Sequence, residues 1–415
     1  MNTPFDALEQ RDPAQRESAL MAALPAQVAH AQAKAPAFAD MLAGVDAAQV
    51  NSRAALAQLP VIRKHELLER QKAHRASNVF GGFSALGFGP GMRRVFASPG
   101  TIYEPEGTRP DYWRLARAMH ATGFRAGELI HNGFSYHFTP AGSMMETAAH
   151  ALGCTVFPGG TGQTEQQVMA MAELKPAGYA GTPSFLKIIL EKADDMGVAL
   201  PSLTKALVSG EAFPPSLRDW FTQRGIAAYQ CYATADIGLI AYETSAREGL
   251  VLDEGVIVEI VRPGTGDPVP EGEVGELVIT TLNPDYPLIR FGTGDLSAVM
   301  PGNCPTGRTH TRIKGWMGRA DQTTKVRGMF VHPSQVNDVA KRFPEVLRAR
   351  LVVSGEMAND QMALHVECAA LPDGLREQLE QAVREVTKLR ATVVTQAPGS
   401  LPNDGKVIED ARSYQ

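Results

Sequence analysis

Hydrophobic positions in the first 75 residues recur at helical spacing. The stretch from 20 to 42 shows this period and contains Pro25 and Pro36, each of which is expected to break the helix. A turn at residues 59–61 precedes another helical stretch. We therefore expect this region to form a helical lead-in that packs on the part of the chain that follows.

The spacing changes between residues 85 and 225, where short apolar runs of strand length alternate with helical stretches. Examples of the strand-like runs are ELIHNGF at 128–134, CTVFPGG at 154–160 and KALVSGEAF at 205–213. Strands that alternate with helices favour an α/β layer with a mainly parallel sheet.

The chain becomes β-rich between residues 250 and 300, with apolar runs GVIVEIV and GELVITTL joined by a loop of turn residues. A polar segment with several glycines at 319–330 indicates a hinge, and an α–β–β–α–β order follows it. The expected fold is therefore α/β. It has a large N-terminal domain, 1–321, with mixed or parallel sheets and a β-rich subdomain, and a small α+β C-terminal lid domain, 322–415.

Composition narrows the class of protein. The 415 residues are 44% hydrophobic and 20% charged, which is typical of a globular protein with large cores. Lys+Arg 40 against Asp+Glu 45 leaves a net charge of −5, too balanced for a dedicated nucleic-acid binder. The chain has no apolar run of about 18 residues, so no membrane partner is expected. Four widely separated cysteines favour free thiols in a reducing cytoplasm.

Three glycine-rich loops follow strand-like runs, at 98–108, 157–162 and 209–215. Anionic ligands often bind at such positions, because backbone N–H groups and helix N-termini point there. Most loops of this kind are only turns, so each of them alone is a weak signal.

Together, five motifs in a fixed order are more specific. They are SGEA at 209–212, CYATADIG at 231–238, RFGTGD at 290–295, GRADQTTKVRG at 318–328 and LPNDGK at 401–406. In this order the sequence resembles the AMP-forming adenylating superfamily, and most of all the phenylacetate-CoA ligase family. The segments TPSFL and HPSQV point to that branch, and the resemblance spans residues 60 to 410.

The resemblance implies an AMP-forming acid–CoA ligase. Such an enzyme activates an aromatic, phenylacetate-like or other aryl carboxylic acid with ATP to an acyl-adenylate, and then transfers the acyl group to CoA. It implies ATP, Mg²⁺ and CoA as cofactors and a small carboxylic acid as partner, and it leaves a homodimer open.

The resemblance also implies roles for residues at the nucleotide. The adenine-side turn matches Gly210, Glu211 and Ala212, the aromatic beside the base matches Tyr232, and the ribose acceptor matches Asp295. The complete nucleotide-binding set is Ser209, Gly210, Glu211, Ala212, Tyr232, Ala233, Thr234, Asp295 and Arg319. In the alternative interpretation Tyr232 belongs to the core and Asp295 closes a turn.

Three further matches lie toward the C-terminus. Lys406 matches the catalytic lysine that stabilises charge between the carboxylate and the α-phosphate, although a lysine near a chain end is usually a solvated charge. Asp321 matches the hinge about which the small domain rotates. Gly328 matches a backbone position beside the tunnel for the pantetheine arm of CoA.

Alternating aromatic residues in HNGFSYHFTPAG resemble the loop that lines the acid pocket. Phe134, Tyr136 and Phe138 are the candidates. A flat aromatic acid would fit such walls by stacking. The alternative is a buried strand edge.

The phosphate loop departs from the family pattern. ASPGTIYEPEGTR keeps Ser98, Gly100 and Thr101, but it carries Glu104 and Glu106 and lacks the lysine with which the family's loop ends. We expect the loop to turn both acids outward and to present its backbone donors, with Arg109 as the cation. In the alternative the acids face the site and the protein no longer uses ATP.

Two further departures concern metals. Ala235 replaces a hydroxyl residue, and Asp236 stands where a glutamate is usual, which leaves a shorter carboxylate for Mg²⁺. Some relatives carry a cysteine-rich metal site, but only Cys304 and His310 remain here. Two ligands fall short of a tetrahedral set, so no structural zinc is expected.

Two other functions remain open. One is a nucleotide- or acyl-binding protein with lost or altered catalysis, which the altered phosphate loop favours. The other is an adenylating enzyme that passes the acyl group to an acceptor other than CoA.

Overall fold

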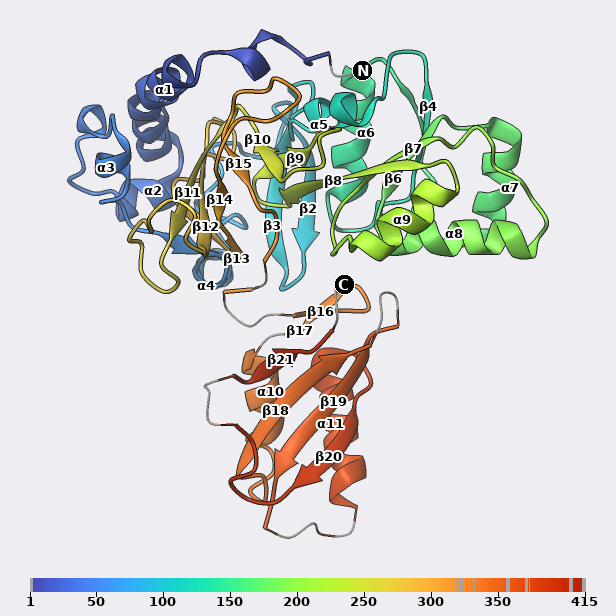
Figure 1. Ribbon diagram of the computed structural model, residues 1–415. Helices are drawn as coiled ribbons and strands as arrows, with labels where there is room; N and C mark the ends of the chain where they lie inside the picture. The colour runs from blue at the N-terminus through green and yellow to red at the C-terminus, as the bar shows by residue number, and fades with distance from the viewer. Residues whose placement is uncertain are drawn as a thin grey trace. The chain divides into compact units, whose positions relative to one another are not determined.

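The computed structural model divides into two compact units, Met1–Gly318 and Arg319–Gln415 (Figure 1). It describes residues 3–317, 319–320, 324–331, 333–355, 359–369, 372, 374–402 and 406–412. The boundary expected from the sequence lies three residues later, at 321/322. Its hinge residue, Asp321, lies outside the described residues.

The N-terminal lead-in is helical. It comprises η1 (Ala7–Gln10), α1 (Pro13–Lys34), α2 (Pro36–Met41), η2 (Ala47–Gln49), α3 (Arg53–Leu56), the short strand β1 (Ile62–Arg63) and α4 (Lys64–His74). The expected break at Pro25 is wrong, because α1 runs through it. Leu24 and Val28 of α1 are fully buried, and this packing offsets the backbone hydrogen bond that Pro25 cannot donate. Pro36 does separate two helices, and it begins α2.

Within the described residues, a nine-stranded sheet carries the α/β layer, with order β14-β15-β10-β9-β8-β7-β6-β4-β5. Five strands are parallel: β4 (Leu129–Asn132), β5 (Thr155–Phe157), β6 (Gly178–Gly181), β7 (Lys205–Val208) and β8 (Ala227–Thr234). The rest are antiparallel: β9 (Gly238–Glu243), β10 (Leu250–Leu252), β14 (Val299–Met300) and β15 (Arg312–Ile313). The predicted parallel α/β layer is confirmed.

Five helices accompany the parallel strands. They are α5 (Ala116–Thr122), α6 (Ala141–Ala151), α7 (Thr164–Leu174), α8 (Pro183–Asp195) and α9 (Pro215–Gln223). The carboxyl ends of the parallel strands therefore lead into loops and helix N-termini, which is the edge where ligands bind in α/β sheets.

The β-rich part forms a second sheet, of order β1-β13-β12-β11. β11 (Val256–Val261), β12 (Gly275–Thr281) and β13 (Phe291–Ser297) are antiparallel neighbours, as the sequence predicted. The sequence did not predict that β1 of the lead-in pairs in parallel with β13. A separate hairpin, β2 (Met92–Ser98) and β3 (Ile102–Gly107), carries the candidate phosphate loop at its turn.

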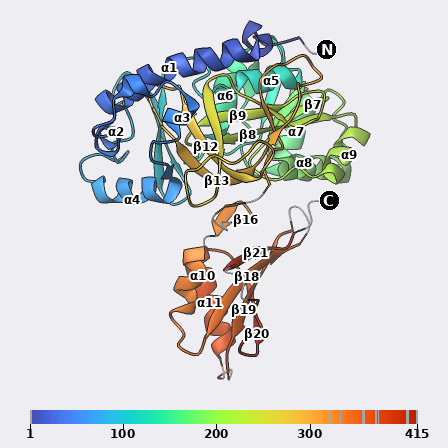
Figure 2. The same cartoon turned by 60° about the vertical axis from the view of Figure 1, so that its left-hand side comes forward.

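The small unit is an α+β fold, as predicted. It contains β16 (Thr324–Val326), β17 (Met329–Val331), α10 (Pro333–Ala340), β18 (Arg348–Ser354), β19 (Gln361–Glu367), α11 (Leu375–Thr387), β20 (Thr392–Gln396) and β21 (Ile408–Asp410). The sheet order is β20-β19-β18-β21, and both helices lie on one of its faces (Figure 2). Leu379 and Val383 of α11 pack there against Leu351 and Leu364 of the sheet. The strand β21 was not predicted.

One buried arginine ties the lead-in to the second sheet. The guanidinium of Arg290, 1% exposed, donates two hydrogen bonds of 3.0 Å to the carboxylate of Glu259. It also donates to the backbone carbonyls of Ala57, Leu59 and Gly266. These bonds satisfy a charge that would otherwise be very costly to bury, and they fix the chain immediately before β1.

Of the helices that the structure describes, none combines the length and apolar character needed to cross a membrane.

We predict that Arg290→Met lowers the free energy of unfolding of the large unit by about 3–5 kcal/mol, because it leaves the Glu259 carboxylate buried and unpaired. Urea unfolding measures the loss, and Arg290→Met/Glu259→Gln should recover part of it. Lys192→Ala, which breaks an exposed pair with Glu165, is the control and should cost less than about 1 kcal/mol. A loss equal to that of the control would contradict the prediction.

Candidate functional site

Two sheets meet at Asp295. The hydroxyl of Tyr232, on β8, donates to Asp295 Oδ2 at 2.7 Å, and Asp295 lies on β13 of the other sheet. The indole Nε1 of Trp316 donates to Asp295 Oδ1 at 3.1 Å. The carboxylate is 8% exposed and has both oxygens engaged, so it is held in a single position. The structure thus brings together Tyr232 and Asp295, which the sequence assigned to the same candidate nucleotide site but not to each other.

Sequence reasoning missed Trp316. It lies two residues before the GRAD motif and is one of three tryptophans in the chain. The sequence offered one signal for it. Tryptophan is rare in this chain and carries one hydrogen-bond donor, and this one lies close to the TGD and GRAD motifs.

The turn at Ser209–Ala212 follows β7 at the carboxyl edge of the parallel sheet. Ser209 Oγ donates to the carbonyl of Cys231 at 2.8 Å, which holds the turn against β8. Glu211 Oε1 accepts a 2.7 Å bond from the backbone N–H of Ser184, in the first turn of α8. Gly210 has φ +85°, a conformation that favours glycine. Ala233 and Thr234 continue β8 beyond Tyr232, and Thr234 Oγ1 accepts from Ile237 N at 3.1 Å.

The candidate phosphate loop does not present its acids as expected. Glu104 is fully buried, and its carboxyl binds both the hydroxyl and the backbone N–H of Ser98 across the hairpin. The expectation that Glu104 turns outward is therefore wrong. The donors of Ser98 are directed at Glu104, and the backbone N–H of Thr101 donates to the carbonyl of Ser98 at 3.0 Å. Gly100 and Thr101 at the turn are exposed, but the expectation that Ser98 and Thr101 offer their backbone donors to a ligand is wrong.

The other charged residues of this hairpin are also paired. Glu106 is buried and accepts bonds of 3.1 and 3.2 Å from Arg94, so it too does not turn outward. Arg109 forms an ion pair with Asp285 at 3.2 Å, and its guanidinium lies 5.6 Å from the Tyr112 ring centroid. Arg109 is thus engaged by neighbouring side chains in this structure.

A buried acidic cluster lies beneath the hairpin. Asp236 is 3% exposed, and its Oδ2 forms a 2.8 Å ion pair with Lys64 Nζ. Burial, reinforced by the negative charge of Asp236, raises the pKa of Glu104 to about 8, although Lys64 opposes this. Glu104 is therefore mostly uncharged at neutral pH, and it does not repel a phosphate as an ionised carboxylate would.

Two polar atoms of this region have no hydrogen-bond partner among the described residues. They are Asp236 Oδ1 and the hydroxyl of Tyr286, both buried. The charges of Asp236 and Glu104 add to burial in raising the pKa of Tyr286. An orphaned carboxylate oxygen is costly to bury, so Asp236 fits a site where a cation binds with the nucleotide.

Sequence reasoning also missed Lys64. It is the first residue of α4, where the helix macrodipole disfavours a positive charge. That unfavourable placement was the one signal in the sequence.

The acid-pocket candidates differ in exposure. Phe134 is 7% exposed and packs in the core, Tyr136 accepts a 2.8 Å bond from Asn132 Nδ2, and Phe138 is 79% exposed.

A second aromatic cluster lies on neighbouring strands. The His131 ring stacks on Phe157 at 5.3 Å and on Tyr179 at 6.3 Å between centroids. Its Nε2 lies 2.6 Å from Gln167 Oε1. Because Gln167 Nε2 donates to two carbonyls, Oε1 must accept, so His131 carries its proton on Nε2. Burial lowers the pKa of His131, which keeps this ring neutral at neutral pH.

In the small unit, Arg319 is partly exposed and Lys406 is exposed. Gly328 lies in the turn between β16 and β17 at φ +82°, and a Cβ there would meet nothing within 4 Å. The backbone conformation of this turn therefore favours glycine. The sequence-based expectation was instead that glycine leaves room for the pantetheine arm of CoA.

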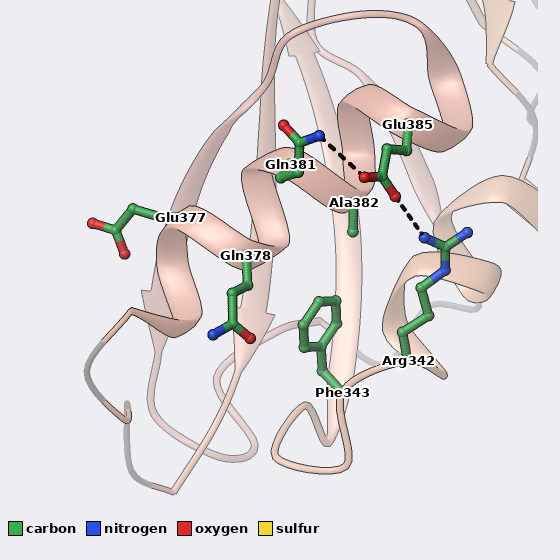
Figure 3. A pocket seen from close by; sticks show the side chains of 7 residues that line it. All are labelled: Arg342, Phe343, Glu377, Gln378, Gln381, Ala382 and Glu385. Carbon is green, nitrogen blue, oxygen red and sulfur yellow. Dashed lines mark hydrogen bonds and ion pairs between the residues drawn. The ribbon is translucent and has the colours of Figure 1, made fainter.

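A surface pocket of the small unit lies between α11 and residues 342–343 (Figure 3). Arg342 and Gln381 both bind the carboxylate of Glu385, at 3.1 and 3.0 Å. None of the residues that the sequence analysis singled out lines it.

The cysteines are free and buried. Cys304 Sγ contacts the hydroxyls of Thr244 and Thr306, at 3.3 and 3.1 Å, and His310 Nδ1 accepts from the backbone of Thr311. In the part of the chain that the structure describes, no three His, Cys, Asp or Glu side chains are grouped to hold a metal ion.

Comparison with known proteins identifies the class and the family. Residues 115–283 match the family model of AMP-binding enzymes, which is the class that the fold and the site define. A phenylacetate-coenzyme A ligase of Aromatoleum evansii is 31% identical over 73% of this chain and 70% of its own. The Pseudomonas putida ligase of the same name is 30% identical over 75% and 76%, and that of Thermus thermophilus is 28% identical over 90% and 91%. The chain belongs to the phenylacetate-CoA ligase family.

A solved structure extends the likeness to the whole chain. The 2-hydroxyisobutyryl-CoA ligase, crystallised with 2-HIB-AMP and CoA, matches with a TM-score of 0.84 and 26% identity. The match covers 98% of this chain and 92% of that one.

We predict that Glu104→Gln changes how stability depends on pH. The folded state raises the pKa of Glu104 from 4.5 to about 8, so its contribution is complete below pH 4.5 and is lost as pH rises toward 8. Glutamine does not titrate, so between pH 5 and pH 8 the variant should gain more than about 1 kcal/mol relative to the wild type. Urea unfolding at the two pH values measures this gain. The exposed Glu173→Gln is the control, and a constant difference for Glu104→Gln would refute the assignment.

Proposed function

We propose that this protein is an AMP-forming acid–CoA ligase. It activates a carboxylic acid with ATP to an acyl-adenylate and releases pyrophosphate, and it then transfers the acyl group to CoA. The observation that carries the proposal is the arrangement of Tyr232, Asp295 and Trp316. The carboxylate of Asp295 is held by bonds from Tyr232 and Trp316 where the two sheets meet, in a chain that belongs to the phenylacetate-CoA ligase family. The acyl-AMP and CoA bound in a ligase of the same overall fold support the same sequence of steps.

Each group of the chain has a distinct task in this proposal. The turn Ser209–Ala212 and the end of β8 bind the adenosine, and Asp295 accepts bonds from the ribose hydroxyls. Gly100 presents its backbone N–H and Thr101 its hydroxyl to the phosphates, and Arg319 reaches the ribose or a phosphate. Asp236 holds Mg²⁺, which when bound neutralises phosphate charge. Lys406 stabilises the charge that develops between carboxylate and α-phosphate, and the small unit turns about Asp321 between the two half-reactions.

The proposed acid is aromatic. The names of the relatives favour a phenylacetate-like substrate, and Phe134, Tyr136 and Phe138 are the proposed pocket residues, with Phe157 and Tyr179 as further aromatic candidates. A small 2-hydroxy acid is the second candidate, because a 26% identical neighbour is named for one. Pyrophosphate release measured with both acids decides between them, and adding CoA identifies the acceptor. Release that occurs equally without any acid would contradict a ligase.

The four free, buried cysteines support a reducing compartment such as the cytoplasm. A homodimer remains part of the proposal and is measurable by light scattering.

We predict that Lys406→Ala lowers the rate of adenylation by about 10²–10³, because one charge contact made only in the transition state is lost. ATP affinity, measured by calorimetry, should change little. Lys341→Ala, which removes another exposed lysine of the same unit, is the control. Near-wild-type pyrophosphate release by the Lys406 variant would show that this lysine is a solvated charge.

We also predict that Glu104→Gln leaves ATP affinity at pH 7 within about threefold of the wild type. The carboxyl is buried and mostly protonated there, so glutamine resembles its resting form. Calorimetric titration measures the affinity. A strong gain in ATP binding would instead favour the protein with lost catalysis, whose loop acids repel the nucleotide.

A further inference from the structure

The hairpin turn at 98–101 contains no cation, although a phosphate chain needs one. Of the basic residues nearby, Arg109 is paired with Asp285 and Arg94 with Glu106. Arg75 donates to the carbonyl of Thr101 at 2.8 Å and lies over the Tyr103 ring. On α4, Arg70 is paired with Asp40 and Lys72 with Glu69. Lys64, the first residue of α4, is 34% exposed and is paired with Asp236, the carboxylate proposed to hold the divalent cation.

One face of α4 lines the hairpin. Leu68, one turn after Lys64, is the residue that a Cβ on Gly100 would meet, at 3.3 Å. Gln71, a further turn along, bonds both the N–H and the carbonyl of Tyr103 at 2.8 Å. Residues spaced by three or four lie on the same helical face, so Lys64 continues this face at the end of α4 that meets β1.

Strand pairing brings the same lysine to the nucleotide groups. Arg63 of β1 is opposite Gly292 of β13. Lys64, the next residue, therefore lies beside β13, the strand that carries Asp295. Its Nζ reaches Asp236, four residues after Tyr232. Figure 1 shows α4 beside the end of β13. Lys64 therefore lies where the hairpin, the TGD strand and the Tyr232–Asp236 segment converge.

We propose that Lys64 binds the phosphate chain of ATP in place of the lysine that the hairpin lacks, and that it leaves Asp236 when the divalent cation carried by the nucleotide takes over that carboxylate. The proposal rests on the proposed function of this site.

Charge balance supports an exchange of partners. Before binding, Lys64 neutralises an Asp236 carboxylate that is 1% exposed. On binding, the carboxylate gains the metal and the ammonium gains a phosphate, so neither the buried carboxylate nor the partly exposed ammonium is left unpaired. The orphaned Oδ1 of Asp236 leaves that carboxylate with capacity for a further ligand.

The two half-reactions provide the test. Adenylation uses the triphosphate, whereas thioester formation from a preformed acyl-adenylate does not. Lys64→Met should lower the rate of adenylation about 10²-fold and leave thioester formation from acyl-adenylate and CoA within about twofold. Calorimetry should show weaker ATP binding and unchanged AMP binding. Equal losses in both half-reactions, or unchanged ATP binding, would overturn the proposal.

Three matched variants sharpen the result. Lys72→Met removes an exposed lysine of the same helix, which pairs with the exposed Glu69, and should have no effect. Lys64→Arg keeps the charge with a different shape and should lose less than Lys64→Met. Arg75→Met tests the other cation beside the turn. If Arg75→Met weakens ATP binding relative to AMP binding and Lys64→Met does not, the assignment to Lys64 is wrong.

Lys64→Met leaves a buried carboxylate unpaired, so a second comparison covers a failure to fold. Asp236→Asn retains Lys64 without the buried charge, and Asp236→Asn/Lys64→Met removes both. Without Mg²⁺, ATP should bind about 10²-fold more weakly to the double variant than to Asp236→Asn. Equal affinities would refute the role of Lys64. A wild-type protein that binds no ATP would refute the proposed function itself, and a wild type that adenylates acids separates the two questions.

Discussion

The buried Arg290 is the constraint on which the site depends. Its bonds to Glu259 and to the carbonyls of Ala57 and Leu59 hold the lead-in where β1 can pair with β13. Glycine suits position 292 beside β1, since a Cβ there would lie 2.8 Å from Glu276 Oε1 and 3.2 Å from Arg63 Cγ. This register brings α4 to the hairpin. The same register places Lys64, at the start of α4, within reach of Asp236, 172 positions later in the chain.

The chemistry of the site follows from how its buried acids are neutralised. Two carboxylates that are packed near one another cannot both remain ionised at low cost. Asp236 and Glu104 are neutralised in different ways. Asp236 pairs with Lys64, whereas Glu104 stays largely protonated and binds Ser98. A loop that looks too acidic for phosphate therefore presents little negative charge at neutral pH. The acidic residues of the loop therefore argue less strongly for a family member without catalysis, and the missing lysine is the departure that is left.

Local sequence predicted much of the architecture. The parallel layer, the β-rich sheet and the α+β small unit follow from hydrophobic spacing, and Tyr232 and Asp295 from their motifs. The break at Pro25 failed because tertiary burial of the surrounding α1 residues outweighs one missing hydrogen bond. The prediction that Glu104 points outward was wrong because the sequence gives its formal charge but not its burial, which raises its pKa and neutralises it.

By itself, the sequence determined the helices, strands and motifs that depend on near neighbours, because hydrophobic spacing and turn chemistry act over a few residues. The motifs, taken in order, indicated the fold class and the family, and they assigned Tyr232 and Asp295 to one candidate site. Only the tertiary structure decided that Trp316 holds Asp295 and that Lys64 meets Asp236. These contacts join segments that strand register and the bonds of Arg290 bring together, and no local pattern encodes a partner so distant along the chain.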